Sequence, residues 1–137
     1  MSTSVREFEN ISEFLKSVDD AISEYRKRLG ELLRKLEELR IRAEQEKKLK
    51  AILSKLGLSE TTVANEVALR NVRIVVNPTA MQELAAMEAA VEALNNKVTL
   101  LTAVRKELEI LSSIEVGAKL SVIYLDEVPR TIVLRLS

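Results

Sequence analysis

Apolar residues in the first part of the chain recur with a heptad spacing. Beginning at Phe8, they follow one another in alternating steps of three and four residues, which aligns them along one face of a helix. This first stripe contains Ile11, Leu15, Val18, Ile22, Tyr25, Leu29, Leu32, Leu36, Leu39 and Ala43, and apolar flanking positions are Phe14, Leu33 and Ile41. The regularity is lost at Glu46, and Gly57 is a suitable residue for a helix end. The pattern predicts a long coiled-coil helix over roughly residues 5–57.

A second stripe of the same spacing follows a segment typical of a β-strand. Residues 66–77 are rich in β-branched side chains, and Pro78 favours the start of a helix directly after them. The second stripe contains Leu84, Met87, Val91, Leu94, Val98, Leu101 and Leu108. Arg105 occupies one position of this stripe, where a buried guanidinium needs a carboxylate partner or a path to water. The helix should extend to about residue 113, and its low charge and many alanines indicate packing on more than one side.

The last part of the chain has the composition of a β-hairpin. Lys119–Leu125 and Thr131–Leu136 are the predicted strands, and Asp126–Arg130 is the predicted turn. We therefore expect an α+β fold in the order long helix, strand, second long helix, hairpin. Its two segments would be the coiled-coil helix at 1–57 and a strand-helix-hairpin segment at 58–137, and the molecule would be elongated.

The predicted strands raise a problem of pairing. A continuous helix over residues 79–113 would be about 50 Å long and would hold the strand at 66–77 away from the terminal hairpin. Either this helix breaks at Asn95-Asn96 and folds back, or two chains pair so that a strand of one completes the sheet of the other. Because the heptad phase continues from Leu94 to Val98, we favour pairing between chains.

The charge along the helices favours an antiparallel arrangement. Residues 1–24 carry two basic and six acidic side chains, whereas residues 25–57 carry eleven basic and five acidic ones. The second helix begins with Glu83, Glu88 and Glu92, so folding back would place its acidic end beside the basic half of the first helix. The longer first helix would then leave an overhang that exposes Phe8, Ile11, Leu15 and Val18 to a partner.

Composition excludes several kinds of chemistry. The 137 residues include neither Cys nor His, and 21 basic residues balance 21 acidic ones. This removes thiolate and imidazole nucleophiles and metal ligands, and it leaves no net charge to attract nucleic acid. We expect no cofactor and no metal, and the chain has neither the apolar core of a signal peptide nor an apolar run of membrane-spanning length. We expect a soluble, cytoplasmic protein, and its abundant Lys, Glu and Ile are also typical of a thermophile.

Each candidate site has a simpler structural explanation. Asp19-Asp20 would lie on a solvated helix face without a third ligand, and Asp126–Arg130 belongs to the predicted turn. The basic residues between positions 26 and 50 are interleaved with acids and lack aromatic neighbours for base stacking. Arg70 and Arg73 are a better candidate for phosphate contact, but arginines beside an edge strand also discourage aggregation. An enzyme is therefore not expected.

Long helices separated by short strands resemble prefoldin subunits in their pattern. Prefoldins place paired strands in the middle and end on a helix, whereas this chain ends on the predicted strand Thr131–Leu136. We expect a non-enzymatic coiled-coil structural or adaptor protein that forms a homodimer or higher oligomer and docks a protein partner, as a cytoskeletal or assembly-associated scaffold. A prefoldin-like chaperone clamp for unfolded proteins is the first alternative, and a nucleic-acid-organising protein is the second. The oligomer interface would be the first stripe from Ile11 to Leu39 together with the second stripe from Leu84 to Leu108.

Overall fold

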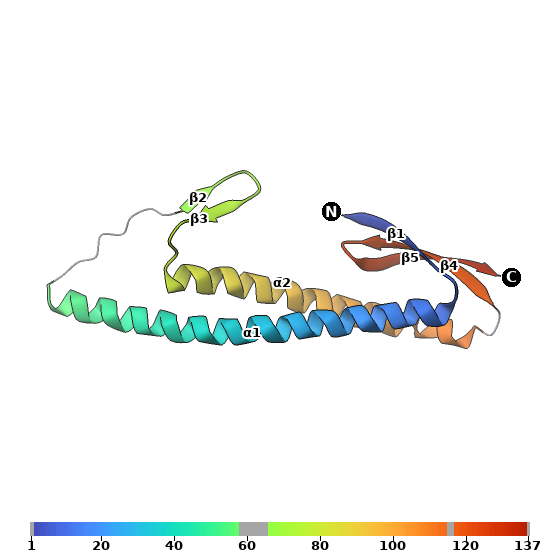
Figure 1. The fold of residues 1–137 in the computed structure, drawn as a ribbon, viewed down its shortest axis with the longest axis horizontal. Coiled ribbons are helices and arrows are strands. Elements are labelled where there is room, and N and C mark those ends of the chain that lie inside the picture. The colour runs from blue at the N-terminus through green and yellow to red at the C-terminus, as the bar shows by residue number, and fades with distance from the viewer. Residues whose placement is uncertain (1, 58–65, 115–116, 137) are drawn as a thin grey trace. The chain divides into compact units, whose positions relative to one another are not determined.

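The structure is a computed structural model that describes residues 2–57, 66–114 and 117–136. Helices and strands follow one another in the order β1 (Thr3–Phe8), α1 (Ile11–Lys55), β2 (Glu66–Ala68), β3 (Arg73–Val75), α2 (Ala80–Glu107), the 3₁₀ helix η1 (Leu108–Ser113), β4 (Ala118–Leu125) and β5 (Val128–Leu136) (Figure 1). The strands pair antiparallel in two separate sheets. The predicted α+β fold with two long helices is confirmed.

The chain divides into two compact units. One contains Met1–Leu29 and Ala93–Ser137, and we call it the sheet unit because it holds β1, β4 and β5. The other contains Gly30–Glu92, and we call it the hairpin unit because it holds β2 and β3. Each unit therefore includes a part of α1 and a part of α2.

The first helix begins later than the heptad pattern predicts. Asn10 caps α1, because its side-chain Oδ1 accepts a hydrogen bond from the Glu13 backbone N–H at 2.8 Å. The residues before this cap form β1 instead of helix, so the prediction of a helix start near residue 5 is wrong. At the other end, Gly57 has a φ of 78°, the left-handed conformation expected of a residue just past a helix. The predicted helix end is confirmed.

The sheet of the sheet unit places β4 in the centre, between β1 and β5. In the β1–β4 register, Phe8 lies opposite Leu120 and Ser4 lies opposite Tyr124. The third strand of the predicted hairpin sheet therefore comes from the N-terminal segment of the same chain. The sequence favours strand pairing between chains because residues 66–77 are the only predicted strand outside the hairpin. In the structure, β1 fills the third position of the sheet from within the same chain.

The turn between β4 and β5 is tighter than predicted. Asp126 and Glu127 form a two-residue connection, and their φ angles are 51° and 69°. Positive φ at both central residues is the feature of a type I′ turn, which matches the twist of a β-hairpin. Pro129 lies inside β5 instead of in the turn, opposite Tyr124 and beside an irregularity in the ladder.

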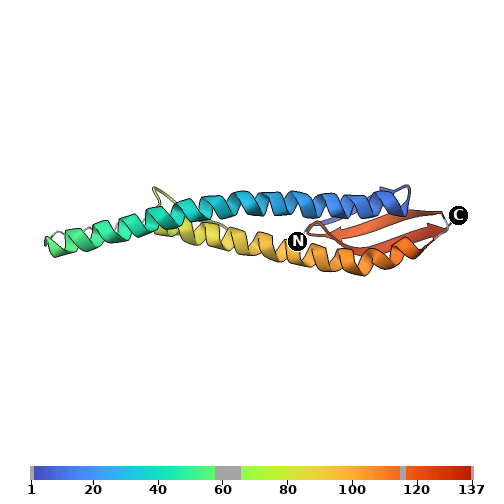
Figure 2. The ribbon, with the colours of Figure 1, turned by 90° about the horizontal axis from the view of Figure 1, so that it is seen from below.

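The sheet lies against α1 and the C-terminal part of α2 in the sheet unit (Figures 1 and 2). Alternate residues of β4 point toward the helices, and two of them, Leu120 and Val122, are at most 1% exposed. They meet Phe14 and Val18 of α1 and Leu101 of α2 in one apolar cluster. Because a helix layer and a sheet layer both contribute, this unit has a closed core.

The hairpin unit has a much smaller core. Its buried apolar side chains among the described residues are Leu36, Leu39, Ala43 and Ala80. Thr79 caps α2 by accepting a hydrogen bond from the Gln82 N–H at 3.1 Å, while the Gln82 side chain accepts one from the Thr79 N–H at 3.0 Å. Glu46 of α1 accepts a hydrogen bond from the Ala80 N–H at 2.7 Å. The break of the heptad pattern at Glu46 therefore coincides with the residue of α1 that meets the start of α2.

The predicted single strand at 66–77 is wrong. This segment forms two three-residue strands, β2 and β3, which pair in the register Glu66 to Val75 and Ala68 to Arg73. Arg70 and Asn71 lie in the connection, where polar residues interrupt the β-branched run. By contrast, the prediction that the second helix continues through Asn95-Asn96 is confirmed, because α2 is unbroken from Ala80 to Glu107.

Candidate interaction surface

The residues of both predicted stripes face inward within the single chain. From Ile11 to Leu39 and from Leu84 to Leu108, every stripe residue that we assigned to an oligomer interface is buried or half-buried. In the sheet unit, Val18, Ile22 and Tyr25 join Val98, Leu101 and Leu108 in the core cluster. The chain thus covers these side chains itself, and their role between chains stays a prediction.

The exposed overhang lies at the opposite end of α1 from the predicted one. Val18 is 2% exposed, and Phe8, Ile11 and Leu15 pack against the sheet-unit core, so the prediction of an N-terminal overhang is wrong. The reason is that β1, β4 and β5 cover this end of the helix. At the other end, α1 continues from Glu46 to Lys55, about 14 Å beyond its contact with the start of α2.

This C-terminal end of α1 is amphipathic, and its apolar side chains are exposed. Leu49, Ile52 and Leu56 are 54%, 55% and 68% exposed, and Leu53 is half-buried beside them. Their spacing forms an apolar stripe on one helix face. The same residues are accompanied by exposed Lys47, Lys48, Lys50 and Lys55. We call residues 47–57 the α1 tip; it combines an apolar stripe with four positive charges.

The start of α2 is exposed as well, but it carries the opposite charge. Met81 is 55% exposed, and Ala85, Glu88 and Glu92 follow it on the same helix face and are also exposed. The sequence indicated that α2 packs on more than one side, yet the alanines at positions 85, 86, 89, 90 and 93 are exposed in the single chain. A depression of about 280 Å³ lies beside this surface and is lined by residues such as Gln45, Leu49 and Ala80.

The β2–β3 hairpin is amphipathic. In its register, Val67 pairs with Ile74, and the Leu69 N–H donates to the Val72 carbonyl at 2.8 Å, so these four side chains share one face. All four are between 46% and 61% exposed. The other face carries an ion pair between Arg73 Nε and Glu66 Oε1 at 3.2 Å. A sheet of two three-residue strands is marginal without a surface to cover it.

Opposite charges pair between α1 and α2 in both units. In the sheet unit, Arg105 Nε donates to Asp19 Oδ1 at 2.8 Å, which confirms that this stripe arginine needs a carboxylate partner. In the hairpin unit, Arg42 lies 3.5 Å from Glu83, as the charge pattern predicts. The helices run antiparallel in each unit, because residues early in α1 contact residues late in α2 and the reverse.

The candidate sites that sequence alone suggested do not come together. Asp19 pairs with Arg105, whereas Asp126 lies in the β4–β5 turn, where its Oδ1 accepts a hydrogen bond from the Ser2 N–H at 2.9 Å. Arg73 pairs with Glu66. In the part of the chain that the structure describes, no group of three or more acidic residues is placed to hold a metal ion.

Comparison with known proteins identifies no family for this chain. Neither a protein-family model, nor a curated protein, nor a solved structure matches the chain. Within the described ranges, no helix combines the length and the apolar character that crossing a bilayer requires. The interaction surface of the hairpin unit is therefore interpreted from its own residues.

Proposed function

We propose that this chain is a non-enzymatic structural or adaptor protein whose copies associate through the hairpin unit. The observation that carries the proposal is the distribution of exposed large apolar side chains. Of sixteen such side chains among the described residues, eleven belong to the hairpin unit, which nevertheless has the smaller core. A surface of this kind is typical of a protein interface.

A second copy of the chain is the occupant that fits this surface. The α1 tip carries four lysines and an apolar stripe, and the start of α2 carries Glu83, Glu88 and Glu92 together with Met81. A two-fold arrangement would place the tip of each copy on the α2 start of the other, so every favourable contact would occur twice. Opposite charges would surround apolar contacts, which is the usual composition of an interface rim and centre.

This arrangement uses side-chain faces instead of strands shared between chains. The seam between α1 and α2 would be an antiparallel coiled coil within each copy, and the α1 tip would extend it onto the neighbouring copy. The apolar face of β2–β3 would be covered in the same contact. The two edge strands of the sheet unit, β1 and β5, would remain for the docking of another protein by strand addition.

Light scattering over a dilution series tests the self-association. The wild-type chain should have the mass of a dimer at high concentration, and Ile52→Asp in the α1 tip should give a monomer. Ile110→Asp is the matched control, because Ile110 is 73% exposed but belongs to the sheet unit. A wild-type monomer at every concentration, or a dimer that tolerates Ile52→Asp, would overturn the proposal.

A charge-swap experiment tests the orientation of the two copies. Reversal of two tip charges, by Lys50→Glu with Lys55→Glu, should weaken the dimer. Adding Glu88→Lys with Glu92→Lys should restore it, because the opposite charges would again face each other across the interface. If the second pair of substitutions weakens the dimer further, the tip does not contact the start of α2.

A chaperone-like clamp is the second candidate function. The exposed tip residues Leu49, Ile52 and Leu56 favour it, as does the paired hairpin between two long helices, the feature that prefoldin subunits place in their middle. A clamp should suppress the aggregation of reduced, unfolding lysozyme at a concentration where the chain itself is monomeric. Suppression that Ile52→Asp abolishes would favour the clamp over the scaffold.

A further inference from the structure

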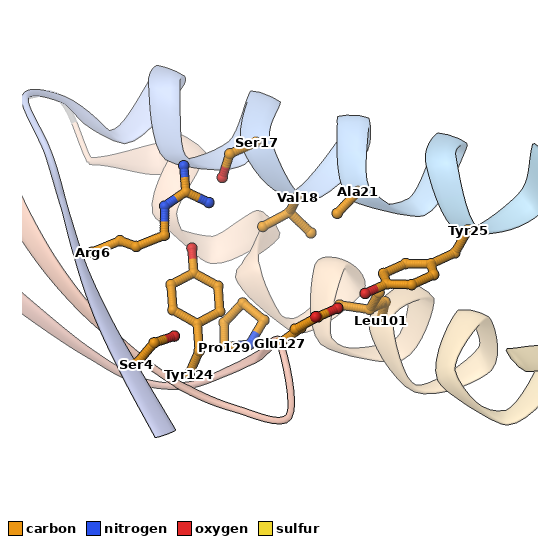
Figure 3. Close-up of a pocket in the computed structure, with 10 residues that line it drawn as sticks. All are labelled: Ser4, Arg6, Ser17, Val18, Ala21, Tyr25, Leu101, Tyr124, Glu127 and Pro129. Atoms are coloured by element: carbon orange, nitrogen blue, oxygen red, sulfur yellow. The ribbon is translucent and has the colours of Figure 1, made fainter. Parts of the chain in front are cut away.

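The sheet unit contains a pocket that its core does not fill. It lies between β1, α1, α2 and the β4–β5 turn and has a volume of about 240 Å³ (Figure 3). One water molecule needs only about 10–15 Å³ of such space, whereas sites for drug-sized ligands begin near about 300 Å³. The pocket therefore has the size for a small organic molecule.

The two ends of the pocket are polar and its middle is apolar. Arg6, Ser17 and Tyr124 gather at one end, and Tyr25 and Glu127 lie toward the other (Figure 3). The walls between them include Val18, Leu101 and Pro129. A ligand that fits would have a polar group at one end and a compact apolar body.

Tyr124 presents a buried hydroxyl to the first end. Its side chain is 7% exposed, and among the described residues its hydroxyl meets no partner with hydrogen-bond geometry. Arg6 and Ser17 approach it, and the Ser17 hydroxyl, which donates its own proton to the Phe14 carbonyl at 2.7 Å, keeps lone pairs that can accept. Burial raises the pKa of Tyr124 above its ordinary value, although the charge of Arg6 opposes the rise. The hydroxyl therefore keeps its proton at neutral pH and can donate it to an acceptor in the pocket.

Arg6 supplies a positive charge beside this hydroxyl. Its guanidinium carbon lies 5.0 Å from the centre of the Phe8 ring and 5.8 Å from that of Tyr124. Within the described ranges, no carboxylate lies within ion-pair distance of Arg6. Glu127 at the far end is paired with Lys97 at 3.5 Å, so the available charge of the pocket is positive.

We propose that this pocket binds a small carboxylate with a compact, branched apolar body. The carboxylate would accept hydrogen bonds from the guanidinium of Arg6 and from the Tyr124 hydroxyl, which satisfies the buried donor. The apolar body would contact Val18, Leu101 and Pro129. This binding is independent of the self-association proposed above, because it uses residues of the sheet unit alone.

The intrinsic fluorescence of the protein gives a direct assay. The chain has no Trp and only two Tyr, Tyr25 and Tyr124, and both line the pocket. Isobutyrate is a suitable probe, and isobutyramide has nearly the same shape without the charge. We expect a saturable change of tyrosine fluorescence with sodium isobutyrate at constant ionic strength, and no saturable change with isobutyramide.

Variants at the polar end locate the binding. Arg6→Gln should weaken the binding of isobutyrate by about tenfold or more, because a charge-assisted hydrogen bond is lost. Arg130→Gln is the matched control, since Arg130 is an exposed arginine of the same sheet that does not line the pocket. Circular dichroism checks that both variants fold. If Arg6→Gln does not fold, the comparison of isobutyrate with isobutyramide on the wild-type protein still tests whether the pocket recognises the carboxylate.

Three results would overturn the proposal. The first is the absence of a saturable response to isobutyrate, which would mean that the pocket holds only solvent. The second is an equal response to isobutyramide or to inorganic phosphate, because either would show that the carboxylate with its apolar body is not what is recognised. The third is unchanged binding in a folded Arg6→Gln variant.

Discussion

Phe14 in the sheet unit and Leu33 in the hairpin unit occupy similar places in the sequence pattern but differ in burial. Both are apolar residues that flank the first heptad stripe, yet Phe14 is 0% exposed and Leu33 is 46% exposed. The difference is that the sheet covers a second face of α1 beside Phe14. A heptad stripe therefore indicates one covered helix face. A flanking apolar residue becomes part of the core only where a sheet also packs on the helices.

Substitution of Phe14 and of Leu33 by alanine should give the largest expected difference in the free energy of unfolding. Phe14→Ala should lower the free energy of unfolding of the sheet unit by about 3–5 kcal/mol, because it leaves a cavity in the closed core. Leu33→Ala should lower the free energy of unfolding of the hairpin unit by about 0.5 kcal/mol or less. Urea unfolding followed by tyrosine fluorescence measures the effect on the sheet unit, since Tyr25 and Tyr124 both belong to it, and far-ultraviolet circular dichroism measures the effect on the hairpin unit. Similar losses for the two variants would contradict the comparison.

A smaller effect is expected at the ion pairs of the two units. Arg105 is 23% exposed and pairs with Asp19, whereas Arg40 is 56% exposed and pairs with Glu37 at 3.6 Å. Arg105→Met should cost on the order of 1 kcal/mol, because a partly buried charged hydrogen bond is lost. Arg40→Met should leave stability nearly unchanged, since exposed pairs contribute little. The same urea titration, with far-ultraviolet circular dichroism as a second probe for the hairpin unit, measures both.

Glu46 tests how the hairpin unit holds the start of α2. Glu46→Ala removes the acceptor of the Ala80 N–H and a negative charge near a helix N-terminus, at a cost of about 0.5–1 kcal/mol. Glu46→Gln keeps an acceptor and should lose only the charge contribution. Hydrogen exchange at the amides of residues 80–83 should be faster in the Ala variant than in the Gln variant. Equal exchange in wild type and both variants would show that the contact does not order this helix end.

The smallest expected effect is a loss of stability at alkaline pH that depends on Tyr124. Because folding raises the pKa of Tyr124 above its ordinary value near 10, the folded state binds its proton more tightly than the unfolded state. Stability should therefore decline as the pH rises above about 10. In Tyr124→Phe this part of the decline should be missing. Thermal unfolding of both proteins between pH 8 and pH 11 measures the difference, and parallel curves would exclude the effect.

Much of the helical part of this fold is readable from the sequence. The two stripes identify the inward faces of both helices, and the Pro78 and Gly57 signals predict a helix start and a helix end close to those of α2 and α1. Arg105 is recognisable as a residue in need of a partner, although only the structure identifies that partner as Asp19. These features depend on residues that are close in sequence or that repeat with a helical period.

The strands are harder to predict because their partners are distant in sequence. The segment Thr3–Phe8 contains Thr3, Val5 and Phe8, which favour strands, but its place in the sheet is set by pairing with the distant β4. Asn10 and Glu13 form a capping signal that predicts a helix start at Ile11, but the heptad spacing continues through Phe8 and conceals it. The pocket likewise depends on residues from β1, both helices and the β4–β5 turn, which no local pattern brings together.

The pairing of β1 with β4 has a consequence for how the protein is made. Thr3 lies opposite Leu125, so the residues up to Leu125 must be synthesised before β1 finds its place. The helical segments depend on local contacts and form quickly, whereas the sheet requires closure of a very long loop. On the ribosome, the apolar side of α1 around Phe14 would stay uncovered until β4 and β5 emerge. The sheet unit should therefore fold late, and that waiting period is when the nascent chain is most exposed to aggregation.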